Sequence, residues 1–239
     1  MDAKLLPAVL MSALSFGCIV IVLFGLRLAL RRTGFTIAHQ KKIWRTTVIV
    51  ITAWLAITGV LACKGFFTNF SALPPRPVLL LILPLVVFLF IAFSKAGSTL
   101  LTVIPPHWLI GMQAFRILVE ILLWKAFLVN LLPIQMTFEG NNFDGLSGLL
   151  AIPVAMVLYK KWIPQLALVF NMIGVLLLIN ILVIAVLSMP TPLRHFMNEP
   201  PSTLVGEFPF IYLPGVLVAI AQGLHIFSLR QWWLLRKSK

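Results

Sequence analysis

The chain has 239 residues, of which 61% are hydrophobic and only 10% are charged, and its formal net charge is +13. Soluble globular chains carry about 45–50% apolar and about 25% charged residues, so this composition excludes a soluble fold. The positive charge does not indicate nucleic-acid binding, because the basic residues flank apolar segments. At such places Lys and Arg set the orientation in the membrane and contact anionic lipid headgroups.

The apolar residues form long continuous blocks. A bilayer core about 30 Å thick needs a helix of about 20 residues, and hydrocarbon allows the backbone only helices or closed barrels. Barrel strands would alternate apolar and polar residues, which these blocks do not do. We therefore predict an all-α, polytopic transmembrane bundle of seven helices that forms a single domain over residues 1–239. In chain order the predicted spans are 5–30, 46–67, 78–94, 109–132, 145–160, 163–187 and 208–229.

Three features of the chain complete this outline. Basic residues follow the first block and no cleavage pattern comes after it, so we expect a retained span and not a signal peptide. Residues 95–107 either extend the third helix or lie on the membrane surface before Pro105 and Pro106 end the segment. The longest polar connection, 189–207, contains four prolines and predicts an ordered, extended loop.

The basic residues also predict the orientation. With the N-terminus outside and the C-terminus cytoplasmic, thirteen Lys and Arg residues lie on the cytoplasmic side and four on the outer side, which is a strong positive-inside bias. The thirteen are Arg27, Arg31, Arg32, Lys41, Lys42, Arg45, Lys95, Lys160, Lys161, Arg230, Arg236, Lys237 and Lys239, and the four are Lys4, Lys64, Arg76 and Arg194. The acidic residues other than Glu120 fall outside: Asp2, Glu139, Asp144, Glu199 and Glu207. A compact bundle without a eukaryotic sorting signal favours a cell membrane, the bacterial inner membrane, with anionic headgroups at the cytoplasmic face.

The fourth block carries charges within the bilayer. Arg116 and Glu120 lie four residues apart, so they share a helix face and are placed to pair. Gln113 lies on the same face, while Lys125 lies nearer the outer side, where its long chain reaches the headgroups. Charges at the bilayer centre cost roughly 2.5–3.5 kcal/mol each on insertion scales and mark functional sites by default. These four residues form a candidate ion or substrate pathway, although a structural ion pair is an equally good interpretation.

The segment 137–145 is the densest polar stretch of the chain. Glu139, Asn141, Asn142 and Asp144 offer oxygen atoms to a hard cation or a polar ligand. The spacing of a calcium-binding loop is missing, and the same residue types make ordinary turns. Asp144 also fits the N-cap of the fifth span. These four residues are the first outer-loop binding candidates.

His195 and Glu199 in the next outer loop are the remaining binding candidates. They lie four residues apart and would form half of a metal site in a helix, but nothing fixes the other ligands, so we predict no metal. His225 in the last span fits a hydrogen-bonded packing role better than haem ligation, which needs a second axial residue. Cys18 and Cys63 fall at different depths and predict no disulfide, and we expect no cofactor.

Three functions fit these features. The leading hypothesis is a small transporter, channel-like protein or permease component for an ion or small solute, centred on Arg116 and Glu120, in spans that contain kink-forming prolines. The second is a membrane sensor, accessory or assembly protein that binds a ligand or partner through its outer loops. The third and weakest is a lipid-modifying enzyme that uses Glu120, His195 or His225, because no known catalytic motif is present. An oligomer is compatible with all three.

Overall fold

A computed structural model describes residues 4–237, and within this range the chain forms helices and no strands, which confirms the all-α prediction. The α-helices are α1 (Leu5–Arg31), α2 (Ile37–Cys63), α3 (Leu79–Phe93), α4 (Lys95–Val103), α5 (Pro106–Gly111), α6 (Phe115–Leu128), α7 (Gly145–Lys160), α8 (Pro164–Leu187) and α9 (Ala219–Lys237). Short 3-10 helices are η1 (Phe66–Thr68), η2 (Arg76–Val78), η3 (Met112–Ala114), η4 (Ile134–Met136) and η5 (Leu204–Gly206), and η6 (Leu213–Val218) is a π-helical turn. Asp2 and Lys239, two charges used to predict the orientation, lie outside the described residues.

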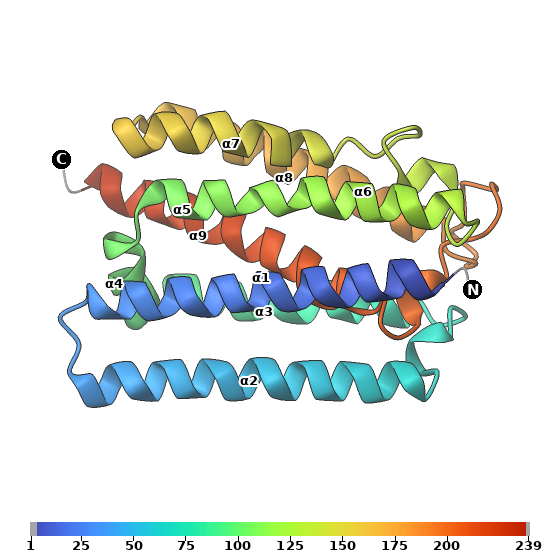
Figure 1. The fold of residues 1–239 in the computed structure, drawn as a ribbon, viewed down its shortest axis with the longest axis horizontal. Coiled ribbons are helices and arrows are strands. Elements are labelled where there is room, and N and C mark those ends of the chain that lie inside the picture. Colours follow the sequence, from blue (N-terminus) through green and yellow to red (C-terminus); the bar gives the residue numbers. More distant parts are fainter. Residues whose placement is uncertain (1–3, 238–239) are drawn as a thin grey trace.

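In the described part of the chain, five helices are long and apolar enough to cross a bilayer. They are Leu5–Arg31, Ile37–Cys63, Arg76–Phe93, Pro164–Leu187 and Leu213–Arg236. α7 is apolar but has only 16 residues, which is about 24 Å at 1.5 Å per residue. α5, η3 and α6 follow one line with a change of helix type between them (Figure 1). Helices of this length and hydropathy indicate a membrane-embedded protein.

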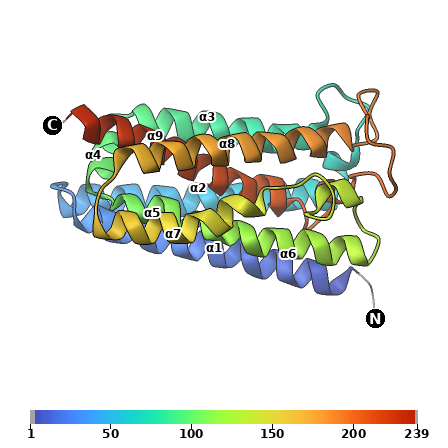
Figure 2. The same cartoon turned by 90° about the horizontal axis from the view of Figure 1, so that it is seen from above.

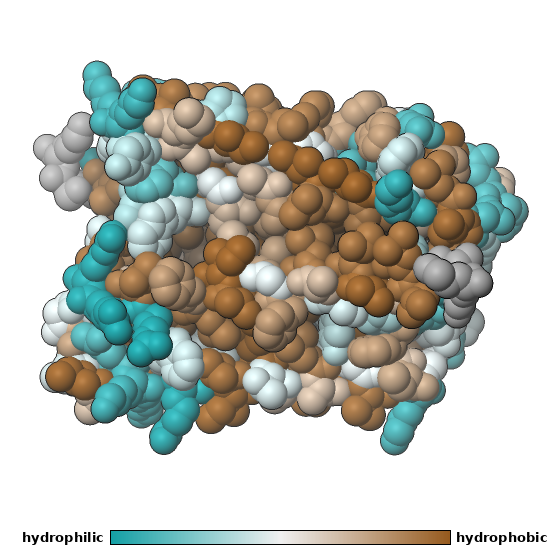
Figure 3. Space-filling view, viewed as in Figure 1, coloured by the Kyte–Doolittle hydropathy of each residue, from teal (hydrophilic) through white to brown (hydrophobic). Residues whose placement is uncertain are grey.

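The side chains are distributed inversely to those of a soluble protein. Phe16 of α1 and Phe90 of α3, both within apolar helices, are 68% and 78% exposed. Figure 3 shows a broad apolar band between the two more polar ends of the bundle. Arg116 and Asn171, in contrast, are only 2% and 1% exposed. Apolar groups outside and polar groups inside are expected where the surrounding solvent is hydrocarbon.

The long helices run side by side, so that the bundle has two ends (Figures 1 and 2). We call one the basic end: α1, α3, α7 and α9 finish there, and α2, α5 and α8 begin there. The opposite, loop end holds the start of α1 and the connections 64–78, 129–144 and 188–212. The described basic residues that the sequence assigns to the cytoplasmic side belong to helix termini or turns of the basic end.

α9 lies in the middle of the bundle. In an 18-residue segment of the helix Leu213–Arg236, 67% of the residues are buried, against 17% in comparable segments of α1 and α2. Its neighbours include α3, α4, α5 and α8. Gln231 of α9 donates hydrogen bonds to the carbonyl oxygens of Leu101 at 2.7 Å and Ile104 at 2.6 Å, and so holds the turn after α4. The central position explains why α9 contributes several buried polar side chains.

Two segments near the basic end differ from the predicted spans. α2 begins at Ile37 instead of near residue 46, and the Thr36 hydroxyl caps it by accepting from the backbone N–H of His39 at 3.3 Å. Hydropathy misses these first turns because they are polar. Residues 95–107 do not extend the third helix: Ser94 breaks it and caps the separate helix α4 by accepting from the N–H of Gly97 at 3.0 Å.

The fourth and last spans also have different bounds. The fourth begins at Pro106 and ends at Leu128, short of residue 132, because Asn130 takes a left-handed conformation with a φ of 56°, which terminates helices. The last begins with the π-helical turn at Leu213 and continues to Lys237. Its later turns are rich in Arg, Gln and Trp, and hydropathy underestimates them.

Candidate functional site

The polar loop between α6 and α7 enters the bundle. α6 extends further toward the loop end than the start of α7 does (Figure 1). The connecting loop 129–144 therefore turns back into the bundle to reach α7. Asn142 of this loop is 1% exposed and contacts Glu120. Glu120 lies eight residues before Leu128, the last residue of α6, or about 12 Å along the helix axis. Irregular backbone at membrane depth is tolerated where it is packed in protein or lines a cavity, which makes this loop the candidate site.

Arg116 pairs with Asp144 and not with Glu120. Its Nε donates to Oδ2 of Asp144 at 2.7 Å, and a terminal nitrogen donates to Oδ1. The two side chains are 1% and 13% exposed. The predicted Arg116–Glu120 pair is therefore wrong in its acidic partner. A guanidinium binds best to a carboxylate that faces both of its parallel N–H groups, and Asp144 on the neighbouring element has this geometry.

A chain of hydrogen bonds from α9 and α8 fixes Arg116. Its second terminal nitrogen lies 3.0 Å from Nε2 of His225, and Nδ1 of His225 lies 2.9 Å from Oδ1 of Asn171. Asn171 in turn donates to the Ser228 hydroxyl at 2.8 Å. Because a guanidinium only donates, Nε2 accepts and the His225 proton is on Nδ1, where it bonds to Asn171. This chain satisfies its members and locks the arginine in place.

Glu120 is bound on one oxygen only. Nδ2 of Asn142 donates to Oε2 at 2.6 Å and to the carbonyl oxygen of Met136 at 3.0 Å. The backbone amide of Phe138 also lies close enough to interact with this carboxyl group. Oε1 is buried and accepts no hydrogen bond from any described residue, and Glu120 as a whole is 6% exposed. A buried carboxyl oxygen of this kind is costly unless a proton, a water molecule or a cation meets it.

A cavity of about 70 Å³ lies beside Glu120. Glu120, Asn142 and Asp144 form its polar side, and most of the remaining wall is aliphatic, including Leu178 of α8 and Pro214 of η6. A cavity needs roughly 10–15 Å³ to hold one water molecule, so this one holds several. The unpaired oxygen and the cavity together make Glu120 the chemically open group of the site.

Two helices change type close to the buried polar groups of the site. η3 interrupts the α5–α6 run directly before Phe115 and Arg116. η6 winds as a π-helix at Leu213–Val218, and its Leu213, Pro214 and Val218 line the cavity. Mid-helix 3-10 stretches and π-turns are frequent at functional sites and hinges. Both irregularities therefore coincide with the buried polar groups.

Two glycines allow the helices to approach at this level. A Cβ atom at Gly174 of α8 would lie 2.4 Å from Cε1 of His225, and one at Gly148 of α7 would lie 2.8 Å from Cγ1 of Ile117. Only glycine leaves room for these contacts. The close approach at Gly174 seats the imidazole ring that holds Arg116.

The other two predicted pathway residues lie apart from the cavity. Gln113 is 1% exposed and donates to the carbonyl oxygen of Ala221 at 3.2 Å, while its own Oε1 lacks a partner among the described residues. Lys125 is exposed, with Nζ 5.0 Å from the Trp124 ring centroid. Gln113 thus joins η3 to α9, and Lys125 lies at the surface of the bundle.

The outer-loop candidates separate into two groups. Asn142 and Asp144 point into the bundle, as described above. Glu139 accepts from Nε1 of Trp124 at 2.8 Å, and the Asn141 carbonyl accepts from Asn180 at 2.9 Å. Neither residue is among the described residues that line the cavity.

The other predicted binding candidates lie in the connection 188–212. Glu199 is bonded to Arg194 at 2.9 Å, and the ring of His195 meets the ring of Phe196 edge-on. Residues 4–237 contain no group of three His, Cys, Asp or Glu side chains that could hold a metal ion. The enzyme hypothesis requires Glu120, His195 or His225 as acid or base. In the described part of the chain no hydrogen bond joins these three side chains, and His225 is bonded to Arg116 and Asn171.

Asn171 and Ser228 are site residues that the sequence interpretation missed. Both are buried, and together they hold His225. The available signal was Asn171 itself, an asparagine within a largely apolar span, since a polar side chain in hydrocarbon needs a partner on another helix. Asp144 was predicted as a binding candidate and as a helix cap; its side chain makes no cap bond and instead pairs with Arg116.

No protein-family model matches the chain, and no curated protein or solved structure is significantly similar to it. The chemistry of the Glu120 site is therefore the basis on which a function is assigned.

Proposed function

We propose that this chain is a membrane transporter or channel-like protein for a small solute, with Glu120 at the centre of the solute site. The supporting observation is the state of Glu120: its Oε1 is buried and lacks a partner among the described residues, and the residue lines a cavity. An ionisable group inside a membrane protein is costly and is retained mainly where it serves an ion or substrate path. The irregular loop and the π-turn beside it are the features expected of such a path.

The Arg116 cluster serves this site as a scaffold. Arg116 stays protonated and cannot relay protons, and its partners Asp144 and His225 engage three of its nitrogens. Asp144 immediately precedes α7, so the pair holds the loop that presents Asn142 to Glu120. Direct contact with the solute is left to Glu120 and Asn142.

The proposal includes seven membrane passes with the N-terminus outside: α1, α2, η2–α3, α5–η3–α6, α7, α8 and η6–α9. The short α7 completes its pass through the descending loop 129–144. The basic end then faces the cytoplasm of a bacterial cell and contacts anionic lipid headgroups, as the positive-inside rule requires.

Flux measurements in proteoliposomes test the function. Small cations, amino acids and sugars are added in turn, and charge movement or uptake is recorded for the full-length protein. We expect at least one solute class to be transported. The Glu120→Gln variant should reduce its flux about tenfold or more, because a hydrogen bond to a charged group contributes about 1.5–3 kcal/mol.

The control variant is Glu139→Gln, which removes a carboxylate that binds Trp124 outside the cavity. It should retain the flux of the unmodified protein. Equal flux in the Glu120→Gln and unmodified proteins, with both folded, would overturn the proposal.

A sensor or accessory role is the second candidate, because the outer loops form a rigid unit. Gln135 donates to the Ser188 hydroxyl at 3.0 Å, and Asn198 donates to Oε1 of Gln135 at 3.0 Å. Phe143 and Met197 of these loops are 50% and 69% exposed, a surface that suits a partner. In this case Glu120→Gln would change stability or partner recovery and no flux would be found in any proteoliposome.

A further inference from the structure

An ionised Glu120 leaves the cavity with a negative charge that a cation would balance. Two carboxylates line the cavity, Glu120 and Asp144, and the second is neutralised by the ion pair with Arg116. The start of α7 lies against Glu120, since a Cβ atom at Gly145 would be 3.2 Å from Cγ of Glu120. A helix N-terminus offers only about half a positive charge. The ionised Glu120 therefore lacks a full counter-charge, and the site then repels anions.

The rest of the wall does not suit calcium or magnesium. Of the 18 lining residues, three (Glu120, Asn142 and Asp144) are polar and the other 15 are apolar. Calcium takes six to eight oxygen ligands and magnesium six, which three side chains shared with Arg116 do not supply. An aliphatic wall such as Leu178, Ile181 and Val218 instead suits a hydrocarbon chain.

The volume limits the length of that chain. About 70 Å³ accommodates about five to seven water-sized groups at roughly 10–15 Å³ each. One of these positions belongs to the charged nitrogen, so about four to six carbon atoms remain.

We propose that the cavity binds a small primary alkylammonium ion, whose N–H groups contact the carboxylate of Glu120 and whose chain of about four to six carbon atoms lies against α8 and η6. An ammonium nitrogen supplies three donors, which the Glu120 carboxylate and the remaining lone pairs of Asn142 and Asp144 accept. The ligand class rests on the proposed function in one respect, namely that the solute site is the cavity at Glu120.

Binding of n-butylammonium chloride to the full-length protein in detergent tests the ligand class. Thermal unfolding and titration calorimetry are recorded with n-butylammonium, with butan-1-ol as its uncharged counterpart, and with sodium chloride. We expect saturable stabilisation by n-butylammonium alone. In a series from ethyl to octyl, the affinity should rise to butyl, pentyl or hexyl and then fall, because longer chains exceed the cavity.

Two variants locate the binding. Glu120→Gln should weaken n-butylammonium binding about tenfold or more, as loss of a bond to a charged group implies, whereas Glu139→Gln should leave it unchanged. Equal stabilisation by butan-1-ol, stabilisation by sodium, or unchanged binding in Glu120→Gln would overturn the inference. If Glu120→Gln does not fold, the comparison of n-butylammonium with butan-1-ol on the unmodified protein decides alone.

The outcomes separate this inference from the transport function. Binding of n-butylammonium without flux of any solute supports the ligand class and overturns transport. Flux of a neutral or anionic solute that n-butylammonium does not inhibit overturns the ligand class and leaves transport standing.

Discussion

Arg116 on α6 donates two hydrogen bonds to the two carboxylate oxygens of Asp144, which lies 28 residues later and directly precedes α7. This ion pair joins the first turn of α6, which lies in the middle of the α5–η3–α6 run, to the beginning of α7. It therefore fixes where α7 begins along α6, and with it the path of the loop 129–144, which carries Asn142, back into the bundle. The position of Asn142 against Glu120 depends on it.

Replacing Asp144 should destabilise the protein strongly. In the Asp144→Asn variant the Arg116 charge stays 2% exposed without a counter-charge, which costs about 3–5 kcal/mol when a buried pair is broken. The double variant Arg116→Met, Asp144→Leu should lose less, because no unpaired charge remains. Unfolding of the protein in mixed detergent micelles by increasing dodecyl sulfate measures both changes.

The exposed pair between Lys4 and Glu207 is the matched control. Its atoms are 2.9 Å apart, but the side chains are 47% and 40% exposed, and such pairs contribute about 0–1 kcal/mol. Glu207→Gln should therefore change the free energy of unfolding by less than about 1 kcal/mol. Equal losses in Asp144→Asn and Glu207→Gln would contradict the scaffold role of Arg116.

The sequence predicts well those features that depend on one helix at a time. Hydropathy alone places α7 at residues 145–160, in agreement with Gly145–Lys160. Arg116 and Glu120 are buried, as expected for charges whose exposure to lipid would be costly. The polar first turns of α2 show the limit of hydropathy, because capping by Thr36 defines that start.

The sequence does not predict which charges meet. Spacing of four residues favours Arg116 and Glu120 within one helix, but the real partner of Arg116 follows from how far α7 is displaced along α6. That displacement depends on packing between helices, such as the approach that Gly148 allows. The bonds of His225 and Asn171 depend in the same way on the placement of α8 against α9.

Gly174→Ala tests the packing that seats His225. The added methyl group would lie 2.4 Å from Cε1 of the imidazole, so the ring has to move and its bond to Arg116 is strained. We expect a loss of about 1–3 kcal/mol, the usual cost of overpacking. Gly17→Ala in α1 is the control, since nothing lies within 4 Å of its added Cβ. Its stability should be unchanged or slightly higher in the same dodecyl sulfate titration.

The native cysteines allow a test of orientation. Cys63 is exposed at the end of α2, on the side of the loop end, and Cys18 is 2% exposed. With the N-terminus outside, a membrane-impermeant maleimide added to intact cells should label Cys63. In the Cys63→Ala, Ala38→Cys variant the thiol moves to the opposite end of α2 and should react only after permeabilisation. The reverse pattern would contradict the proposed topology.

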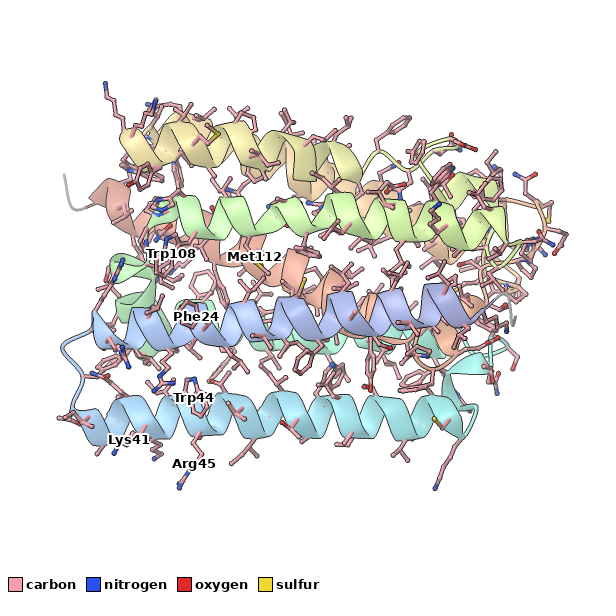
Figure 4. All side chains as sticks on the ribbon, viewed as in Figure 1. Phe24, Lys41, Trp44, Arg45, Trp108 and Met112 are labelled. Atoms are coloured by element: carbon pink, nitrogen blue, oxygen red, sulfur yellow. The ribbon has the colours of Figure 1, made fainter. Side chains whose placement is uncertain are left out.

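The basic end should bind anionic lipid through α2. Figure 4 shows Lys41 and Arg45 pointing away from the bundle, while Trp44 between them points toward α1. Each basic residue near an anionic surface contributes about 1 kcal/mol, so Lys41→Gln and Arg45→Gln should each weaken retention of phosphatidylglycerol about fivefold. Native mass spectrometry of the protein released from mixed micelles measures this retention. Lys64→Gln, at the opposite end of α2, should have a smaller effect, because Lys64 is not part of the cluster that Lys41, Lys42 and Arg45 form at the basic end. Equal effects at both ends of α2 would show that the contact is general charge attraction and not a property of the basic end.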